Sequence, residues 1–243
     1  MVDSTRRVRV LGELVRLLGS RSRPDILWIS KAAGCTTEEA EGAVDDVATV
    51  AASVMELAAN IKTTGRTYYA QFPAPIDLFA LMRLIRPKVV VESGVASGVS
   101  STFMLLGTEA NSKGTLHSVD LPVTRERRRG GEAWAIPSGL SSGWAVPSRL
   151  KDNWDLRTGR SEDLLAPLLR ELRFVDFYCH DSPVDSKHFQ FEMDAVSKHL
   201  RPGSLVVADN TDRGVFNRAA IAVGTRAFYR RGSSLGAFRV PSG

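Results

Sequence analysis

Residues 88–101, KVVVESGVASGVSS, combine an apolar run, a turn of small residues and the start of a second apolar pattern. The run of valines predicts a buried strand, and the acid Glu92 ends that run. Glycines and other small residues form the next turn, after which an apolar pattern predicts a helix over 98–110. A strand, a glycine-containing turn and a helix in this order are typical of the ligand-binding edge of an open α/β sheet.

The chain after residue 74 alternates between strand and helix patterns. Strands are expected over 88–93, 115–122, 153–159, 173–182 and 204–211, and helices over 74–87, 98–110, 161–173 and 185–203. Such alternation predicts parallel strands joined by right-handed crossovers, and therefore a doubly wound α/β sheet. Residues 225–240 contain two short β-like runs around a Gly-Ser turn, which favours an antiparallel C-terminal hairpin.

The first 73 residues are predicted to form an N-terminal helical extension. Apolar spacing indicates helices over 6–19, 24–34 and 35–65, the last capped by Thr36 or Thr37. Small residues along the third helix favour close packing on another helix, so we expect residues 1–73 to act as a cap or to form a homodimer. Residues 74–243 are expected to form the binding domain, with a lid-like insertion at about 123–152.

Composition restricts the class of protein. The chain has 243 residues, a net charge of +5 and 43% hydrophobic residues, which suit one large globular domain with an extra element. No apolar run is long enough for a membrane span, and the N-terminus shows no secretion signal.

The two cysteines, Cys35 and Cys179, lack metal-ligand spacing and favour a reducing cytoplasm. The basic run 124–131 is either a solvated loop or an anion-binding patch; it lacks aromatic residues, so nucleic acid is an unlikely partner.

Polar residues end every predicted strand of the parallel sheet, and these ends share one edge. They are Glu92, Asp120, Gly159 to Ser161, His180 to Ser182, and Asp209 with Asn210. Asp120 can accept hydrogen bonds from the hydroxyls of a ribose, or it can cap the next loop. The turn lacks the G-x-G-x-x-G pattern, and Glu92 would repel a pyrophosphate but attract an ammonium or sulfonium group. The pattern therefore favours a cationic nucleoside.

The chain resembles a class I S-adenosylmethionine-dependent methyltransferase over about residues 75–240. Four stretches carry this resemblance: VVVESGVASGVSS, HSVDLP, FVDFYCHDS and HLRPGSLVVADNT. The resemblance implies a Rossmann-like, mostly parallel seven-stranded sheet and S-adenosyl-L-methionine as cofactor. The turn after the first strand would border the methionine part, Asp120 would hold the ribose, and Arg160 and Ser161 would flank the adenine. The expected cofactor-binding residues are Glu92, Gly94, Ala96, Gly98, Ser100, Asp120, Arg160, Ser161 and His180. Ala96 stands where many members have glycine.

A narrower likeness is to the cation-dependent small-molecule O-methyltransferases. Those proteins carry ligands for Mg²⁺ at the positions of Asp181, Asp209 and Asn210. A bound Mg²⁺ ion would lower the pKa of a substrate hydroxyl. Alternatively, the same residues only cap strands. His180 is the expected general base, or else it only bonds Asp181. The expected catalytic residues are His180, Asp181 and Lys187. Related proteins often carry a second histidine where this chain has Pro183 and Val184; Lys187 and His188 follow on the next helix and could substitute for it.

The irregular stretch after Asp120 holds Trp134, Trp144 and Trp154 among Gly, Ser and Pro residues. Long loops in compact domains are usually functional or disordered, and tryptophans argue against disorder. We expect a lid that shapes an acceptor pocket, with Tyr69, Trp134 and Trp144 contacting the substrate. The expected function is methyl transfer to a hydroxyl of a small molecule, a secondary metabolite or sugar, assisted by Mg²⁺. The alternatives are a nucleic-acid methyltransferase and an inactive cofactor-binding scaffold.

Overall fold

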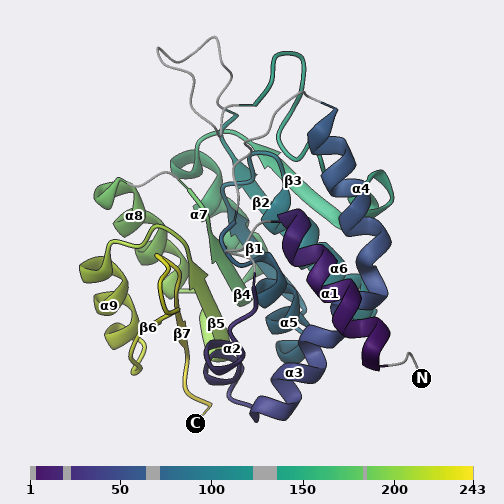
Figure 1. Cartoon of the computed structure of the whole chain (residues 1–243). Coiled ribbons are helices and arrows are strands. Elements are labelled where there is room, and N and C mark those ends of the chain that lie inside the picture. Colours follow the sequence, from purple (N-terminus) through teal and green to yellow (C-terminus); the bar gives the residue numbers. More distant parts are fainter. Residues whose placement is uncertain (1–3, 19–22, 64–71, 123–135, 183–184, 243) are drawn as a thin grey trace.

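The computed structural model describes residues 4–18, 23–63, 72–122, 136–182 and 185–242 (Figure 1). A seven-stranded sheet in the order β3-β2-β1-β4-β5-β7-β6 lies at its centre. The strands are β1 Val89–Ser93, β2 Thr115–Asp120, β3 Trp154–Thr158, β4 Val175–His180, β5 Leu200–Ala208, β6 Phe228–Tyr229 and β7 Gly236–Arg239. The first five are parallel, whereas β7 is antiparallel to both β5 and β6. The predicted fold class, including the C-terminal hairpin, is confirmed.

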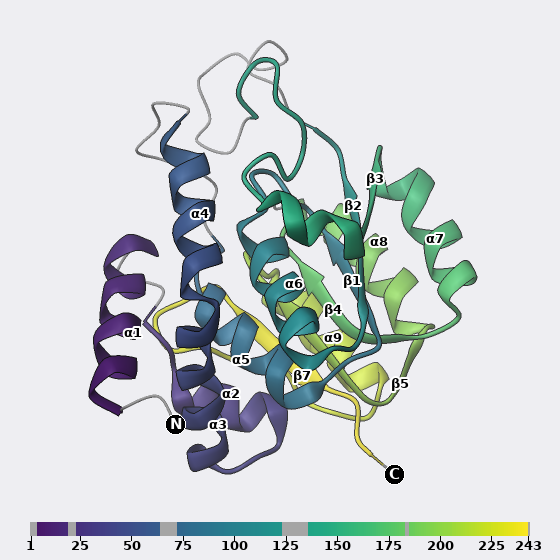
Figure 2. The ribbon, with the colours of Figure 1, turned by 90° about the vertical axis from the view of Figure 1, so that its right-hand side faces the viewer.

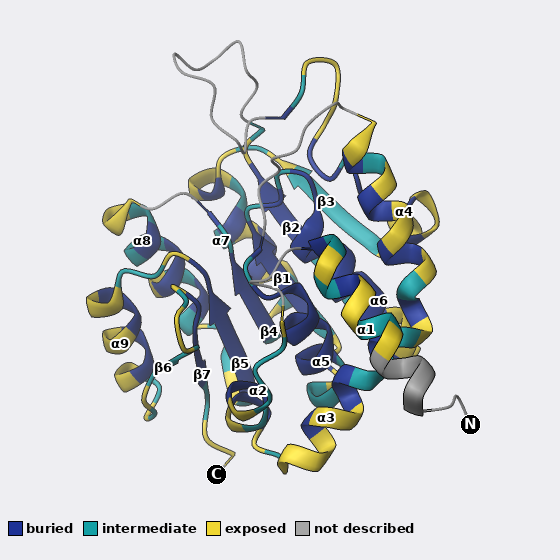
Figure 3. Ribbon diagram, viewed as in Figure 1, coloured by how far each residue is buried: buried dark blue, intermediate teal, exposed yellow. Residues whose placement is uncertain are grey.

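Helices cover both faces of the sheet, as the side view shows (Figure 2). One layer contains α1 Ser4–Leu18, α2 Ile26–Ala33, α3 Thr37–Asp45, α4 Ala51–Lys62, α5 Pro75–Ile85 and α6 Val99–Asn111. The opposite layer contains α7 Ser161–Leu172, α8 Ser186–Ser197 and α9 Arg213–Ala222. Each layer buries its own apolar cluster against the strands, while the outer surfaces of α3 and α9 remain exposed (Figure 3). None of the helices in the described ranges has the length and apolar character needed to cross a lipid bilayer.

The single helix predicted over 35–65 is wrong. The structure divides this region into α3, a 3₁₀ segment η2 over Asp46–Val50, and α4. The segment is rich in β-branched residues, and the Thr49 hydroxyl donates to the carbonyl of Asp46 at 2.6 Å, which favours a tighter turn over a continuous α-helix. The predicted N-cap is confirmed at Thr36, whose side chain forms a capping box with Glu39.

Two further elements differ from the sequence expectation. The helix predicted over 185–203 ends at Ser197, because Pro202 and Gly203 belong to strand β5. Helix α9 was not predicted at all, although Asp212 provides its start signal: Oδ1 of Asp212 accepts hydrogen bonds from the backbone N–H groups of Gly214 and Val215.

The carboxyl ends of β1, β2, β4 and β5 meet at one edge of the sheet. Ser93 pairs with both Val119 and His180, and His180 in turn pairs with Ala208. The first residues beyond these strands continue the ladder: the Asp181 N–H donates to the Ser93 carbonyl at 2.8 Å. The predicted polar edge therefore forms, and the acids that follow the strands come together there.

Candidate functional site

The turn after β1 packs closely against other parts of the chain. Gly94 has a φ of +85°, and a Cβ placed there would lie 2.3 Å from the carbonyl oxygen of Asp181. Gly98 has a φ of +92°, and its Cβ would lie 2.4 Å from the side chain of Val146. Both positions therefore require glycine on conformational and steric grounds. Ala96, between them, also has a positive φ, of 48°.

Glu92 lies inside the protein, on the α6 side of the sheet. Its carboxylate is fully buried and accepts hydrogen bonds from Ser100 at 2.6 Å and from Ser101 and Ser118 at 2.7 Å. Burial raises the pKa of Glu92 to about 7, although the three hydroxyl donors oppose this rise. Glu92 thus connects β1 to α6 and β2, and both Glu92 and Ser100 are enclosed by their neighbours rather than open to solvent.

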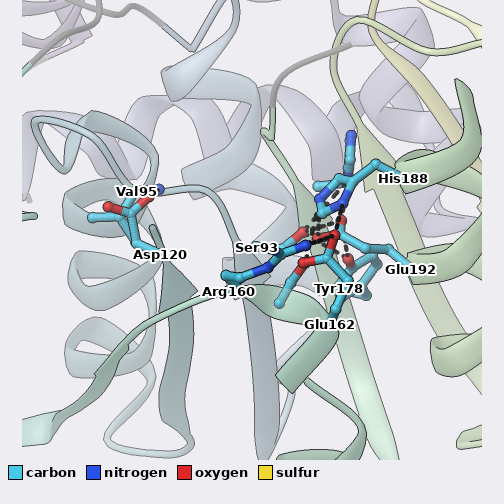
Figure 4. Close-up of polar contacts among 10 residues, drawn as sticks. Ser93, Val95, Asp120, Arg160, Glu162, Tyr178, His188 and Glu192 are labelled. Carbon is cyan, nitrogen blue, oxygen red and sulfur yellow. Dashed lines mark hydrogen bonds and ion pairs between the residues drawn. The ribbon is translucent and has the colours of Figure 1, made fainter. Parts of the chain in front are cut away.

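Asp120 occupies the predicted position at the end of β2 and uses both of its carboxylate oxygens. Oδ1 accepts a hydrogen bond from the Val95 N–H at 2.8 Å, which ties β2 to the turn (Figure 4). Oδ2 accepts a hydrogen bond from the hydroxyl of Ser142. Oδ2 of Asp120 therefore binds a hydroxyl group of the protein, which is the same chemistry as that expected for a ribose.

The described part of the insertion is held against the turn after β1. The Gly143 N–H donates to the Ala96 carbonyl at 2.8 Å, and the Ala145 N–H donates to the Ser97 carbonyl at 3.1 Å. Trp144 is partly buried against the apolar cluster on the α6 side of the sheet. Trp134 and Tyr69, the other predicted substrate contacts, lie outside the described residues, as does the basic run 124–131.

Asp181, Asp209 and Asn210, the predicted metal ligands, follow the adjacent strands β4 and β5. Asp181 is half-buried; its low solvation and the nearby charge of Asp209 raise its pKa well above the usual range, with smaller effects from Glu92 and Asp120. Oδ1 of Asp209 accepts a hydrogen bond from the Ser234 hydroxyl at 2.6 Å. Asn210 is exposed. Among the described residues, no group of three or more His, Cys, Asp or Glu side chains is arranged to hold a metal ion.

His180 lies behind this edge, in a buried polar network on the α8 side. Figure 4 shows its other members Ser93, Tyr178 and Glu192. The ring of His180 is only 1% exposed, and Nδ1 lies 2.6 Å from Oε2 of Glu192. The same oxygen accepts hydrogen bonds from Ser93 at 2.7 Å and Tyr178 at 3.1 Å. Burial alone would raise the pKa of Glu192, but hydrogen bonds from His180 and His188 hold it well below its usual range. Glu192 was not predicted as a site residue, because in the sequence it is one acid on an amphipathic helix.

His188 connects this network to the start of α7. Nε2 of His188 lies 3.0 Å from Oε1 of Glu192 and 3.2 Å from the Ser161 hydroxyl, while Nδ1 lies 3.3 Å from Glu162. The hydrogen bond with Glu192 raises the pKa of His188 to about 9 despite partial burial. Arg160 forms an ion pair with Glu162 at 3.4 Å. Lys187, predicted to be catalytic, is exposed in the first turn of α8.

Comparison with known proteins agrees with this architecture. Residues 91–211 match the family described as a methyltransferase domain. An O-methyltransferase from Bacillus cereus in complex with SAH is 13% identical, with a TM-score of 0.56 over 93% of this chain and 99% of that chain. A putative O-methyltransferase from Klebsiella pneumoniae is 16% identical, with a TM-score of 0.53 over 78% and 89% of the two chains. The calicheamicin methyltransferase CalS11 is 15% identical, with a TM-score of 0.51 over 98% and 94%. No match was found among curated protein sequences.

The strand order and the polar carboxyl edge define a Rossmann-like methyltransferase fold of class I. At these low identities the solved structures show the fold alone, whereas the family match concerns the sequence itself. Residues 91–211 thus match a methyltransferase domain at the level of sequence, and the resemblance stated from the sequence is confirmed.

Proposed function

We propose that the protein transfers a methyl group from S-adenosylmethionine to a hydroxyl of a small molecule. The observation that carries the proposal is the position of Asp120, which ends β2, binds the turn through Val95 and accepts a hydroxyl through its other oxygen. Asp120 would hold the ribose hydroxyls, the turn after β1 would contact the methionine part, and Arg160 and Ser161 would lie beside the adenine. When bound, the cofactor supplies an electrophilic methyl group on a sulfonium ion.

The charges along the edge suit a cationic methyl donor. Burial raises the pKa of Asp181, and the nearby charges of Asp209, Glu92 and Asp120 raise it further. A cation placed at this edge would reduce the mutual repulsion of these carboxylates. The contribution of the protein to the reaction would be mainly to orient the acceptor hydroxyl toward the methyl group.

Removal of the proton from the acceptor hydroxyl is assigned to the edge between β4 and β5. Asp181 is half-buried there and can reach an acceptor, whereas the buried His180 is oriented by Glu192 and would act through its neighbours. Oxygen atoms of Asp181, Asp209 and Asn210 are of the type that Mg²⁺ prefers, and a bound ion would lower the pKa of the acceptor hydroxyl. We include this metal-assisted form in the proposal.

Calorimetry with S-adenosylhomocysteine and with NAD tests the cofactor site. We expect binding of S-adenosylhomocysteine alone, weakened at least tenfold by Asp120→Asn, which retains an acceptor for the Val95 N–H but loses the charge. Asp163→Ala, at an exposed position in α7, is the control and should bind as the wild type does. Equal binding by the Asp120→Asn variant and the wild type would exclude the assigned ribose site.

Methyl transfer from labelled cofactor to a panel of hydroxylated small molecules tests the reaction. An acceptor in that panel should become labelled, and a chelator should abolish the transfer until Mg²⁺ is restored. Turnover at the full rate in excess chelator would exclude the metal-assisted form while leaving the methyltransferase assignment intact.

A further inference from the structure

A cleft with arginine side chains opens beyond Asp209, on the side of the site away from β1. It lies between the residues before α2, the first residue of α9 and the turn between β6 and β7. Its volume of about 980 Å³ is in the range of small-molecule pockets. The function proposed above does not use this cleft.

Positive charge dominates the walls of this cleft. Arg23, Arg213, Arg230 and Arg231 line it, together with one acid, Asp25. The Asp25 carboxylate caps α2 by accepting a hydrogen bond from the Trp28 N–H at 3.1 Å. The net charge of the lining side chains is therefore +3, from four arginines and one aspartate.

Two of these arginines are held in place by neighbours. Nε of Arg230 lies 2.8 Å from the buried carboxylate of Asp77, and another nitrogen of the same side chain donates to the carbonyl of Arg23. The guanidinium of Arg213 lies 4.5 Å from the ring centre of Tyr229. Within the described residues, neither Arg213 nor Arg231 forms a salt bridge with an acid, so their charges are available to a ligand.

The cleft and the acidic edge share a wall. Ser234 lines the cleft, and its hydroxyl donates to Oδ1 of Asp209. Its carbonyl accepts a hydrogen bond from the Thr211 hydroxyl at 3.0 Å, which fixes the turn against the end of β5. A molecule anchored among the arginines would therefore lie beside Ser234, whose hydroxyl contacts Asp209.

We propose that this cleft binds an anionic group of the methyl acceptor, a phosphate or a carboxylate. The inference rests on the proposed function, since it assigns a second point of attachment to the acceptor of that reaction. Planar guanidinium groups match both anions through paired hydrogen bonds. The acids at the edge repel an anion while the arginines attract it, so the charge pattern gives the acceptor one orientation, with its anion in the cleft and its hydroxyl at the edge.

The binding test uses inorganic phosphate and benzoate as separate probes of the two anions, titrated by calorimetry into the full chain. We expect saturable binding of at least one probe, weakened at least tenfold by Arg213→Ala combined with Arg231→Ala. The control combines Arg170→Ala with Arg226→Ala, which removes the same charge from exposed positions that do not line the cleft and should change affinity less than twofold. Unchanged melting temperatures would show that both double variants fold.

The outcomes separate this inference from the proposed function. No saturable binding of either probe, or equal weakening in the two double variants, would overturn the anion site. Binding of S-adenosylhomocysteine is measured on the same proteins. A wild type that does not bind S-adenosylhomocysteine would defeat the proposed function. A wild type that binds S-adenosylhomocysteine but neither anion would defeat only this inference. A final arm compares methylation of 3,4-dihydroxybenzoate with that of catechol: the carboxylate should lower KM in the wild type and lose this advantage in the Arg213/Arg231 variant.

Discussion

The buried carboxylate of Glu92 leads to a quantitative prediction for the variant Glu92→Gln. Burial raises the pKa of this group from its usual 4.5 to about 7. At about 1.36 kcal/mol per pH unit, this difference corresponds to about 3 kcal/mol of stability. The group is fully buried, so solvent does not screen this cost.

The sign follows from which state holds the proton. Below about pH 4.5 the carboxyl group is protonated in the folded and unfolded chain alike, and it costs nothing. Between pH 4.5 and about 7 the unfolded chain releases the proton while the folded chain retains it, so stability falls as the pH rises. Above about pH 7 the full cost is present. Glutamine carries no charge at any of these pH values, so Glu92→Gln escapes the cost.

Urea unfolding of the wild type and of Glu92→Gln at pH 5, 6, 7 and 8 measures the effect. The difference in unfolding free energy should shift in favour of the variant by about 2 to 3 kcal/mol between pH 5 and pH 8. Glu41→Gln, on the exposed side of α3, should give a difference that does not depend on pH. A Glu92→Gln difference that stays constant within about 1 kcal/mol would refute the reasoning, since the carboxylate would then be stabilised as well inside the protein as in water.

Two further substitutions test the packing around the site. Gly94→Ala should lower the free energy of unfolding in urea by roughly 3 kcal/mol or more, because the added Cβ would clash with the Asp181 carbonyl. Gly139→Ala, at a φ of +78° with open space around it, should cost only about 1 kcal/mol. Equal costs would contradict the steric argument. Arg230→Met should cost about 3 to 5 kcal/mol at pH 8, because it leaves the buried Asp77 carboxylate without its counter-ion. The cost should be smaller at pH 5, since burial raises the pKa of Asp77 to about 6 and the acid is then neutral. A loss independent of pH would show that the charge of Asp77 is not responsible.

The strands and the acids that follow them could be predicted because short-range patterns determine them. Runs of apolar residues specify β1, β4 and β5, and the residues after parallel strands must share an edge. The direction in which each side chain points depends on the pairing of strands, and this is why the burial of Glu92 beneath the turn was not predicted. Its alternation with Ser93 places the two side chains on opposite faces of the sheet, where they contact α6 and α8 respectively.

Contacts between distant segments were the least predictable part of the site. Nothing in the sequence near Asp120 indicates that Ser142 binds it, because the partner is brought there by an irregular loop without periodicity. Glu192 likewise has the spacing of an ordinary helical residue, and only the packing of α8 against β1 and β4 brings it to Ser93 and His180. The arginine cleft joins segments from both ends of the chain and could be recognised only once the fold was known.

Helix α5 is buried along its first eight residues, Pro75 to Met82, and so lies inside the molecule instead of on its surface. One side faces the sheet and α6, while α2 and α3 cover the other. A methyltransferase domain expressed from residue 74 onward would expose this helix as a continuous apolar surface to water. We therefore expect such a fragment to aggregate or to require a substitute covering, so that α2 and α3 complete the fold of the domain that follows them in the chain.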